Sequence, residues 1–149
     1  MRKYEICQLV DELTEEHGTN DPKLLCKYLG IQVIYANLGK VKGIFIKCFD
    51  DCHIIISNTL ERFSKDFVLS HELKHYLTDA EEQVMFLKDY TFFYGDKLED
   101  EANYFASQLL LNKETLNYDI DEDEELDPEI EKILKKHIDD YNSSIPKFW

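Results

Sequence analysis

The chain is poor in basic residues and has no long apolar run. Its 149 residues include 17 lysines and arginines against 31 aspartates and glutamates, so the formal net charge is −14 at pH 7. Such an excess of negative charge repels phosphate backbones and anionic headgroups, so we expect no direct binding to nucleic acid or to a membrane. No stretch approaches the roughly 18 consecutive apolar residues that a membrane-spanning helix needs, and no signal-peptide pattern follows Met1. We therefore expect a cytoplasmic protein.

Cysteine is also scarce, with four residues in the whole chain. In a reducing compartment these cysteines are expected to be free thiols. Cys48, Cys52 and His53 lie close together in sequence and form a candidate structural zinc site, because thiolates and imidazoles are preferred zinc ligands. A closed site usually shows a second ligand pair, and the remaining two cysteines fall in the first two expected helices. We therefore favour Cys48 and Cys52 as small apolar residues at the ends of a hairpin.

Apolar spacing and helix-start signals predict the secondary structure. Apolar residues at helical spacing predict helices, and the Asp-Pro pairs at 21–22 and 127–128 are typical of helix starts. Short apolar segments bounded by turn residues predict strands. We expect helices over residues 3–17, 21–29, 61–78, 97–112 and 127–140, and strands over 31–35, 43–48 and 53–57, the last two forming an antiparallel hairpin. These elements define an α+β fold, in which a small, mostly antiparallel sheet is packed by helices.

The negative charge is concentrated near the C-terminus. Nine of the 31 acids lie between residues 119 and 131, where there is no basic residue. Blocks of like charge usually remain solvated. We therefore expect a domain over residues 1–118, an acidic linker over 119–126, and a C-terminal helix and tail over 127–149 that pack on the same domain.

The most informative stretch is His71-Glu72-Leu73-Lys74-His75, inside an expected helix. Residues four apart lie on the same helical face, so His71 and His75 can direct two imidazole nitrogens at one zinc ion. Glu72 is rotated about 100° from His71 and lies beside the metal. From there it can accept a proton from water whose pKa the metal lowers toward about 7. The alternative is that both histidines are ordinary core or surface residues.

A zinc site of this kind needs a third protein ligand, and no other histidine lies near in sequence. The expected helix 97–112 begins with three acids, Glu99, Asp100 and Glu101. Glu101 shares its side of the helix with apolar residues four and eight positions on, and an acid on an apolar face is costly unless it is paired or bound to metal. This favours Glu101 over Glu99. All three acids could instead be present because a helix N-terminus attracts negative charge.

Two motifs carry a resemblance to a known family. HELKHY (71–76) and EDEANYFASQLLL (99–111), preceded by DPKLLCKYLGIQVIY (21–35), resemble the ImmA/IrrE-type zinc metallo-endopeptidases of phages and mobile elements over about residues 20–115. The resemblance implies a zinc peptidase-like domain with a zincin-like HExxH helix. It also implies zinc ligands at His71, His75 and Glu101, with Glu72 as the catalytic acid–base. Lys74 departs from the family, which usually has glycine there.

The resemblance also implies a substrate class and a mechanism. Relatives typically cleave helix-turn-helix repressors of integrated elements or stress regulons, so the expected partner is such a protein. Zinc would polarise the scissile carbonyl while Glu72 moves a proton from water to the leaving amine. Candidates for a further oxyanion donor are Tyr76, Tyr90, Tyr94 and His137, and Asp79 is a candidate for holding a ligand histidine. The alternative function is a catalytically silent protein that sequesters a regulator, although such a protein has no chemical use for Glu72.

Overall fold

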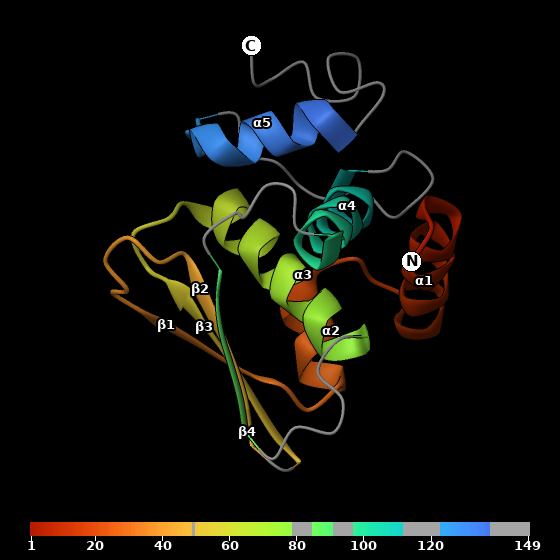
Figure 1. The fold of residues 1–149 in the computed structure, drawn as a ribbon, viewed down its shortest axis with the longest axis horizontal. Helices are drawn as coiled ribbons and strands as arrows, with labels where there is room; N and C mark the ends of the chain where they lie inside the picture. The colour runs from red at the N-terminus through yellow and green to blue at the C-terminus, as the bar shows by residue number, and fades with distance from the viewer. Residues whose placement is uncertain (49, 79–84, 91–96, 112–122, 138–149) are drawn as a thin grey trace.

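A four-stranded sheet is covered on one face by helices (Figure 1). The computed structural model describes residues 1–48, 50–78, 85–90, 97–111 and 123–137. The described helices are α1 (Lys3–His17), α2 (Pro22–Tyr28), α3 (Arg62–Thr78), α4 (Lys97–Leu111) and α5 (Pro128–His137). The described strands are β1 (Gln32–Ala36), β2 (Gly43–Cys48), β3 (Asp51–Ser57) and β4 (Met85–Tyr90). The predicted α+β class is confirmed.

The sheet has the strand order β1-β3-β2-β4. β2 pairs with β3 as the predicted antiparallel hairpin, and β4 adds to the other side of β2, also antiparallel. β1 pairs with β3 in parallel, so the sheet is mixed with antiparallel pairs in the majority. Strand β4 was not predicted, although the apolar run Met85-Phe86-Leu87 is a strand signal.

The two Asp-Pro pairs begin helices as predicted. The Asp21 carboxylate accepts a hydrogen bond from the Lys23 amide at 2.9 Å, and Pro22 is the first residue of α2. Asp127 accepts from the amides of Glu129 and Ile130 at 2.9 and 3.3 Å at the start of α5. In both cases the carboxylate satisfies amides that have no partner within the helix.

Close packing between the sheet and α3 fixes the position of that helix. Alternate residues of the two central strands, including Phe45, Ile54 and Ile56, are fully buried. Because successive strand residues point to opposite faces, these side chains form one apolar layer. Gly43 on β2 lies where a Cβ atom would come within 2.6 Å of Val68 Cγ1 on α3. The glycine therefore permits an approach that a larger residue would prevent.

The C-terminal part of the acidic segment is not simply solvated. Glu124, inside the predicted linker, accepts a hydrogen bond from the Phe63 amide at the start of α3. The Asp127 amide donates to Ser64 Oγ at 3.4 Å in the same place. The contact of Glu124 has a physical reason, because the first amides of a helix attract an acceptor, above all a negatively charged one. The rest of the predicted linker, residues 119–122, lies outside the described residues.

Helix α5 contributes Ile130, Ile133 and Leu134 to the same hydrophobic core as the other helices. Within the described part of the chain, no helix is both long and apolar enough to cross a bilayer. The predicted ends of the fourth and fifth helices and the C-terminal tail fall outside the described residues.

Candidate metal centre

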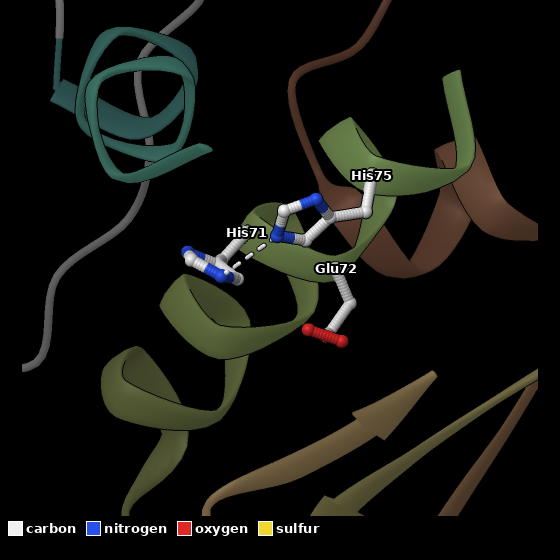
Figure 2. Close-up of side chains that lie close together, drawn as sticks. All are labelled: His71, Glu72 and His75. Atoms are coloured by element: carbon white, nitrogen blue, oxygen red, sulfur yellow. Dashed lines mark hydrogen bonds between the residues drawn. The ribbon is translucent and has the colours of Figure 1, made fainter. Parts of the chain in front are cut away.

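The middle of α3 brings together the three residues of the HExxH motif. The Nε2 atoms of His71 and His75 lie 3.2 Å apart, as the dashed line in Figure 2 marks. Donor atoms of His71, Glu72 and His75 all lie within 4.8 Å of one another, and all three side chains are buried. The four-residue spacing places the two imidazoles on one side of the helix, as predicted.

Glu72 leaves α3 on the side of the strands, as Figure 2 shows. Burial raises the pKa of the Cys52 thiol on β3 to about 12, and the negative charge of Glu72 adds to this shift. The Glu72 carboxylate therefore lies near enough to β3 for its charge to act on Cys52. It is placed beside the histidine pair, in the position that the sequence predicts for an acid–base.

Helix α4 supplies a third donor, Glu99. Its Oε2 atom lies 2.7 Å from His71 Nε2, and its Oε1 atom lies 3.3 Å from His75 Nε2. Glu99 is 1 % exposed, so this contact is shielded from solvent. Two imidazole nitrogens and one carboxylate are the protein donor set that a catalytic zinc commonly has, which leaves a fourth position open. The residues present therefore fit a zinc ion.

Asn103, one turn after Glu99 on α4, orients the first histidine. Asn103 Oδ1 lies 2.8 Å from His71 Nδ1. An amide oxygen accepts a hydrogen bond and cannot donate one, so with this amide orientation His71 Nδ1 carries the proton. The Nε2 lone pair is then free to bind a metal. Asn103 was not predicted as a site residue, although its i, i+4 spacing from Glu99 is a usable signal.

The structure places Glu101 away from the histidines, contrary to our expectation. Glu101 Oε1 lies 3.4 Å from Lys74 Nζ, and Glu101 Oε2 lies 3.1 Å from the N-terminal ammonium. Two helical steps rotate a side chain by about 200°, so Glu99 and Glu101 face different neighbours. The burial of an acid on an apolar face was correctly predicted, but the charges that compensate it here are the ammonium groups of Lys74 and of the N-terminus.

Burial controls the charge of His71. It lowers the pKa of the imidazole from 6.5 to about 4, although the Glu99 carboxylate, which would accept a hydrogen bond from the protonated ring, acts in the opposite direction. His71 is therefore neutral at pH 7, which is the form that binds metal. The two rings meet edge to face with centroids 4.8 Å apart, so the histidine pair is tightly packed.

The alternative zinc site around the β2–β3 hairpin is not assembled by Cys52 and His53, and the side chain of Cys48, its third candidate ligand, lies outside what the structure describes. Cys52 is buried and His53 is half-buried, and neighbouring strand residues point to opposite faces of the sheet. One ion therefore cannot be bound by both. Cys7, Cys26 and Cys52 are free thiols, as expected.

The candidate oxyanion donors are dispersed or undescribed. Tyr76 packs against the hydrophobic core, and His137 packs edge-on against Tyr104 at the far end of α5. The side chains of Tyr90 and Tyr94, and Asp79 as a whole, lie outside what the structure describes.

Comparison with known proteins identifies the family. Residues 26–135 match the peptidase family described as the IrrE N-terminal-like domain, so the chain belongs to this ImmA/IrrE family. It is 36% identical over 103 residues to the uncharacterized immunity region protein 2 of Bacillus phage phi105, covering 68% of this chain and 65% of that protein. It is 31% identical over 110 residues to metallopeptidase ImmA of Bacillus subtilis strain 168, covering 72% and 64%. The chain thus spans just under two thirds of each relative. No solved structure matches.

Proposed function

We propose that this protein is a zinc-dependent endopeptidase of the ImmA/IrrE type. In this proposal His71, His75 and Glu99 bind the metal and Glu72 is the catalytic acid–base. The single observation that supports it best is the contact of Glu99 with the Nε2 atoms of both histidines, at 2.7 and 3.3 Å. Three donors from two helices thereby converge beside a carboxylate that has no part in the contact.

The chain's own residues account for the proton transfers. A bound zinc would polarise the scissile carbonyl and lower the pKa of water at the site. Glu72 then accepts a proton from the attacking water and passes it to the leaving amine. Asn103 keeps the His71 ring in the orientation and tautomer that expose Nε2.

For the substrate we propose a helix-turn-helix repressor. One relative is named as a phage immunity region protein and another as metallopeptidase ImmA, which fits regulation of an integrated element. A net charge of −14 also complements the basic DNA-binding face of a repressor. The observation that favours the silent binding protein instead is the burial of the donors, since His71 and Glu72 are both fully buried.

The test combines metal content with cleavage. We expect about one zinc per chain in protein purified without chelator or histidine tag, and little zinc in His71→Ala. Glu72→Gln should retain the zinc and bind a candidate repressor from the same genome, while cleavage falls by about 100- to 10,000-fold. Gel electrophoresis of the repressor after incubation measures the cleavage. Repressor binding without cleavage by the zinc-loaded wild type would favour the silent binding protein, and a wild type that takes up no zinc would exclude both the metal centre and the peptidase.

A further inference from the structure

A pocket of about 430 Å³ is lined by residues of α1, α4 and α5. In Figure 1, α5 lies above α4 and α1 lies beside it, and α4 contacts both of these helices. The described residues that line the pocket include none of the proposed metal-binding donors. Sites for small organic molecules typically have volumes of roughly 300–1,000 Å³. The pocket is therefore large enough to bind a small molecule, and the proposed peptidase function does not use it.

Two aromatic side chains line this pocket together. Tyr104 of α4 and His137 of α5 meet edge to face, with ring centroids 5.6 Å apart. Burial lowers the pKa of His137 to about 4, and the positive charges of Lys136 and Lys3 act in the same direction, so the ring is neutral at pH 7. The buried side chain of Ile6 on α1 also lines the pocket. These groups offer an apolar surface against which a flat organic ring can pack.

Three lysines line the same pocket, one from each helix, although the chain as a whole has a net charge of −14. Lys3 is the first residue of α1, Lys97 is the first residue of α4, and Lys136 belongs to α5. The Nζ atom of Lys3 lies 5.4 Å from the centroid of the Tyr104 ring, and its charge also acts on His137. The ammonium of Lys3 therefore lies beside the two aromatic rings.

The acids of the pocket balance only part of this positive charge. Asp100 pairs with Lys136 at 3.6 Å, and Glu101 contacts the N-terminal ammonium at 3.1 Å. Within the described part of the chain, neither Lys3 nor Lys97 forms an ion pair. A cation in the first turn of a helix also opposes the helix dipole, so the stability of α1 and α4 does not account for these two lysines.

We propose that this pocket binds a small aromatic anion, with its carboxylate or phosphate group paired to the ammonium of Lys3 and its ring packed against Tyr104 and His137. A few charged groups in a largely apolar pocket are the usual way in which such sites select their ligand. A neutral aromatic molecule would leave the lysine without a counter-charge, and an inorganic anion would make no contact with the rings. The proposal is independent of the metal centre.

The experiment measures binding of the fluorescent aromatic anion 8-anilinonaphthalene-1-sulfonate, whose emission rises in apolar surroundings. We expect a single bound probe molecule per wild-type chain. Lys3→Met should weaken binding by about three- to ten-fold, the loss expected for one charged contact that solvent partly screens. Lys132→Met is the matched control, because it makes the same change at an exposed lysine of α5 that does not line the pocket. It should bind the probe as tightly as the wild type.

A second pair of variants tests the aromatic side of the site. Tyr104→Leu removes the ring and should weaken binding of the probe, whereas Tyr104→Phe keeps the ring and should bind as the wild type does. Circular dichroism shows whether each variant is folded, and only folded variants are compared. The proposal is wrong if the folded wild type does not bind the probe, or if Lys3→Met and Lys132→Met bind it equally well.

Competition against the bound probe distinguishes the possible acid groups. Displacement by adenosine monophosphate indicates a phosphate-bearing ligand, and displacement by indole-3-acetate indicates an aromatic carboxylate. Inorganic phosphate and benzyl alcohol at the same concentration should displace little, because each has only one of the two required features. Displacement by neither aromatic anion, or equally well by inorganic phosphate, would overturn the proposal. His71→Ala should bind the probe as the wild type does, so failure of the metal centre would leave this result unchanged.

Discussion

The two halves of α3 bury polar groups for different reasons. In the N-terminal half, Asp66 is 1 % exposed and receives two hydrogen bonds from the Lys23 ammonium, at 3.1 and 3.2 Å. The buried charge there meets an opposite charge from α2, and Lys23 still reaches solvent. In the C-terminal half, two histidines and the carboxylates of Glu72 and Glu99 lie close together and are buried. The ion pair in the N-terminal half balances a buried charge and stabilises the fold. The cluster in the C-terminal half brings several possible metal-ligand atoms to one point.

This difference indicates which buried acid serves which purpose. An acid that faces a lysine, as Asp66 and Glu101 do, is accounted for by charge balance alone. An acid that faces two imidazole nitrogens, as Glu99 does, is not, because both rings can be neutral. Variants in the first class should therefore alter folding or local charge, and variants in the second should alter metal binding.

The largest effect is expected at Glu99. Glu99→Gln keeps the size of the side chain and removes its charge, so zinc affinity should fall by more than the roughly 10- to 100-fold typical of a supporting residue. Chelator competition measures this loss, with Asp100→Asn as the matched control. A smaller loss in Glu99→Gln than in Glu101→Gln would reverse the assignment of the two acids.

In the N-terminal half, Asp66→Asn should lower stability and leave zinc binding intact. Breaking a buried ion pair costs roughly 3–5 kcal/mol. We expect about 2–3 kcal/mol here, because solvent screens the half-exposed Lys23. Urea unfolding of the metal-free protein measures the loss. A reduced zinc content per folded chain would show that the two halves of α3 are not separable.

A substitution at the contact between α3 and the sheet should lower the unfolding free energy by a smaller amount. In Gly43→Ala the new methyl group would meet Val68 Cγ1 at 2.6 Å, and overpacking of this kind costs about 1–3 kcal/mol in unfolding free energy. The same substitution in a Val68→Ala background should cost clearly less, because the clashing methyl group is gone. Equal costs in the two backgrounds would mean that the close approach is not the cause.

Acid should destabilise the metal-free protein through its buried histidines. Burial lowers the pKa of both His71 and His137 to about 4, below the value of about 6.5 in an unfolded chain. The unfolded chain therefore takes up protons first, so stability is present above pH 6.5 and is lost as the pH falls toward 4. Thermal unfolding at pH 7 and pH 5 measures the loss. His137→Gln should show a smaller decrease than the wild type, and an identical decrease would contradict a contribution from this residue.

Local signals in the sequence were sufficient to predict most of the helices and strands, and to predict the two histidines of the metal centre. The Asp-Pro helix starts, the β2–β3 hairpin and the histidine pair all depend on spacings of a few residues, which backbone geometry converts directly into position. Strand β4 was missed, because a short apolar run between two stronger motifs is a weak local signal.

The choice between Glu99 and Glu101 shows where sequence reasoning stopped. Both acids are buried, as the cost of an acid on an apolar face suggests, but burial alone does not tell which neighbour compensates the charge. That depends on how α4 is rotated against α3, and many side-chain contacts between the two helices set this rotation together. Lys74, which stands where the family usually has glycine, contacts Glu101, and nothing in the local sequence predicts this pair.

The sequence by itself determined the residue types and their local geometry: two imidazoles one turn apart, a carboxylate beside them, and a second helix rich in acids. These follow from the 3.6-residue helical repeat, which needs no tertiary contact. Only the tertiary structure decided that Glu99 meets both histidines, that Asn103 orients His71 and that Glu101 contacts Lys74. Such pairings join residues 24 to 32 positions apart in the chain, and packing alone brings them into contact.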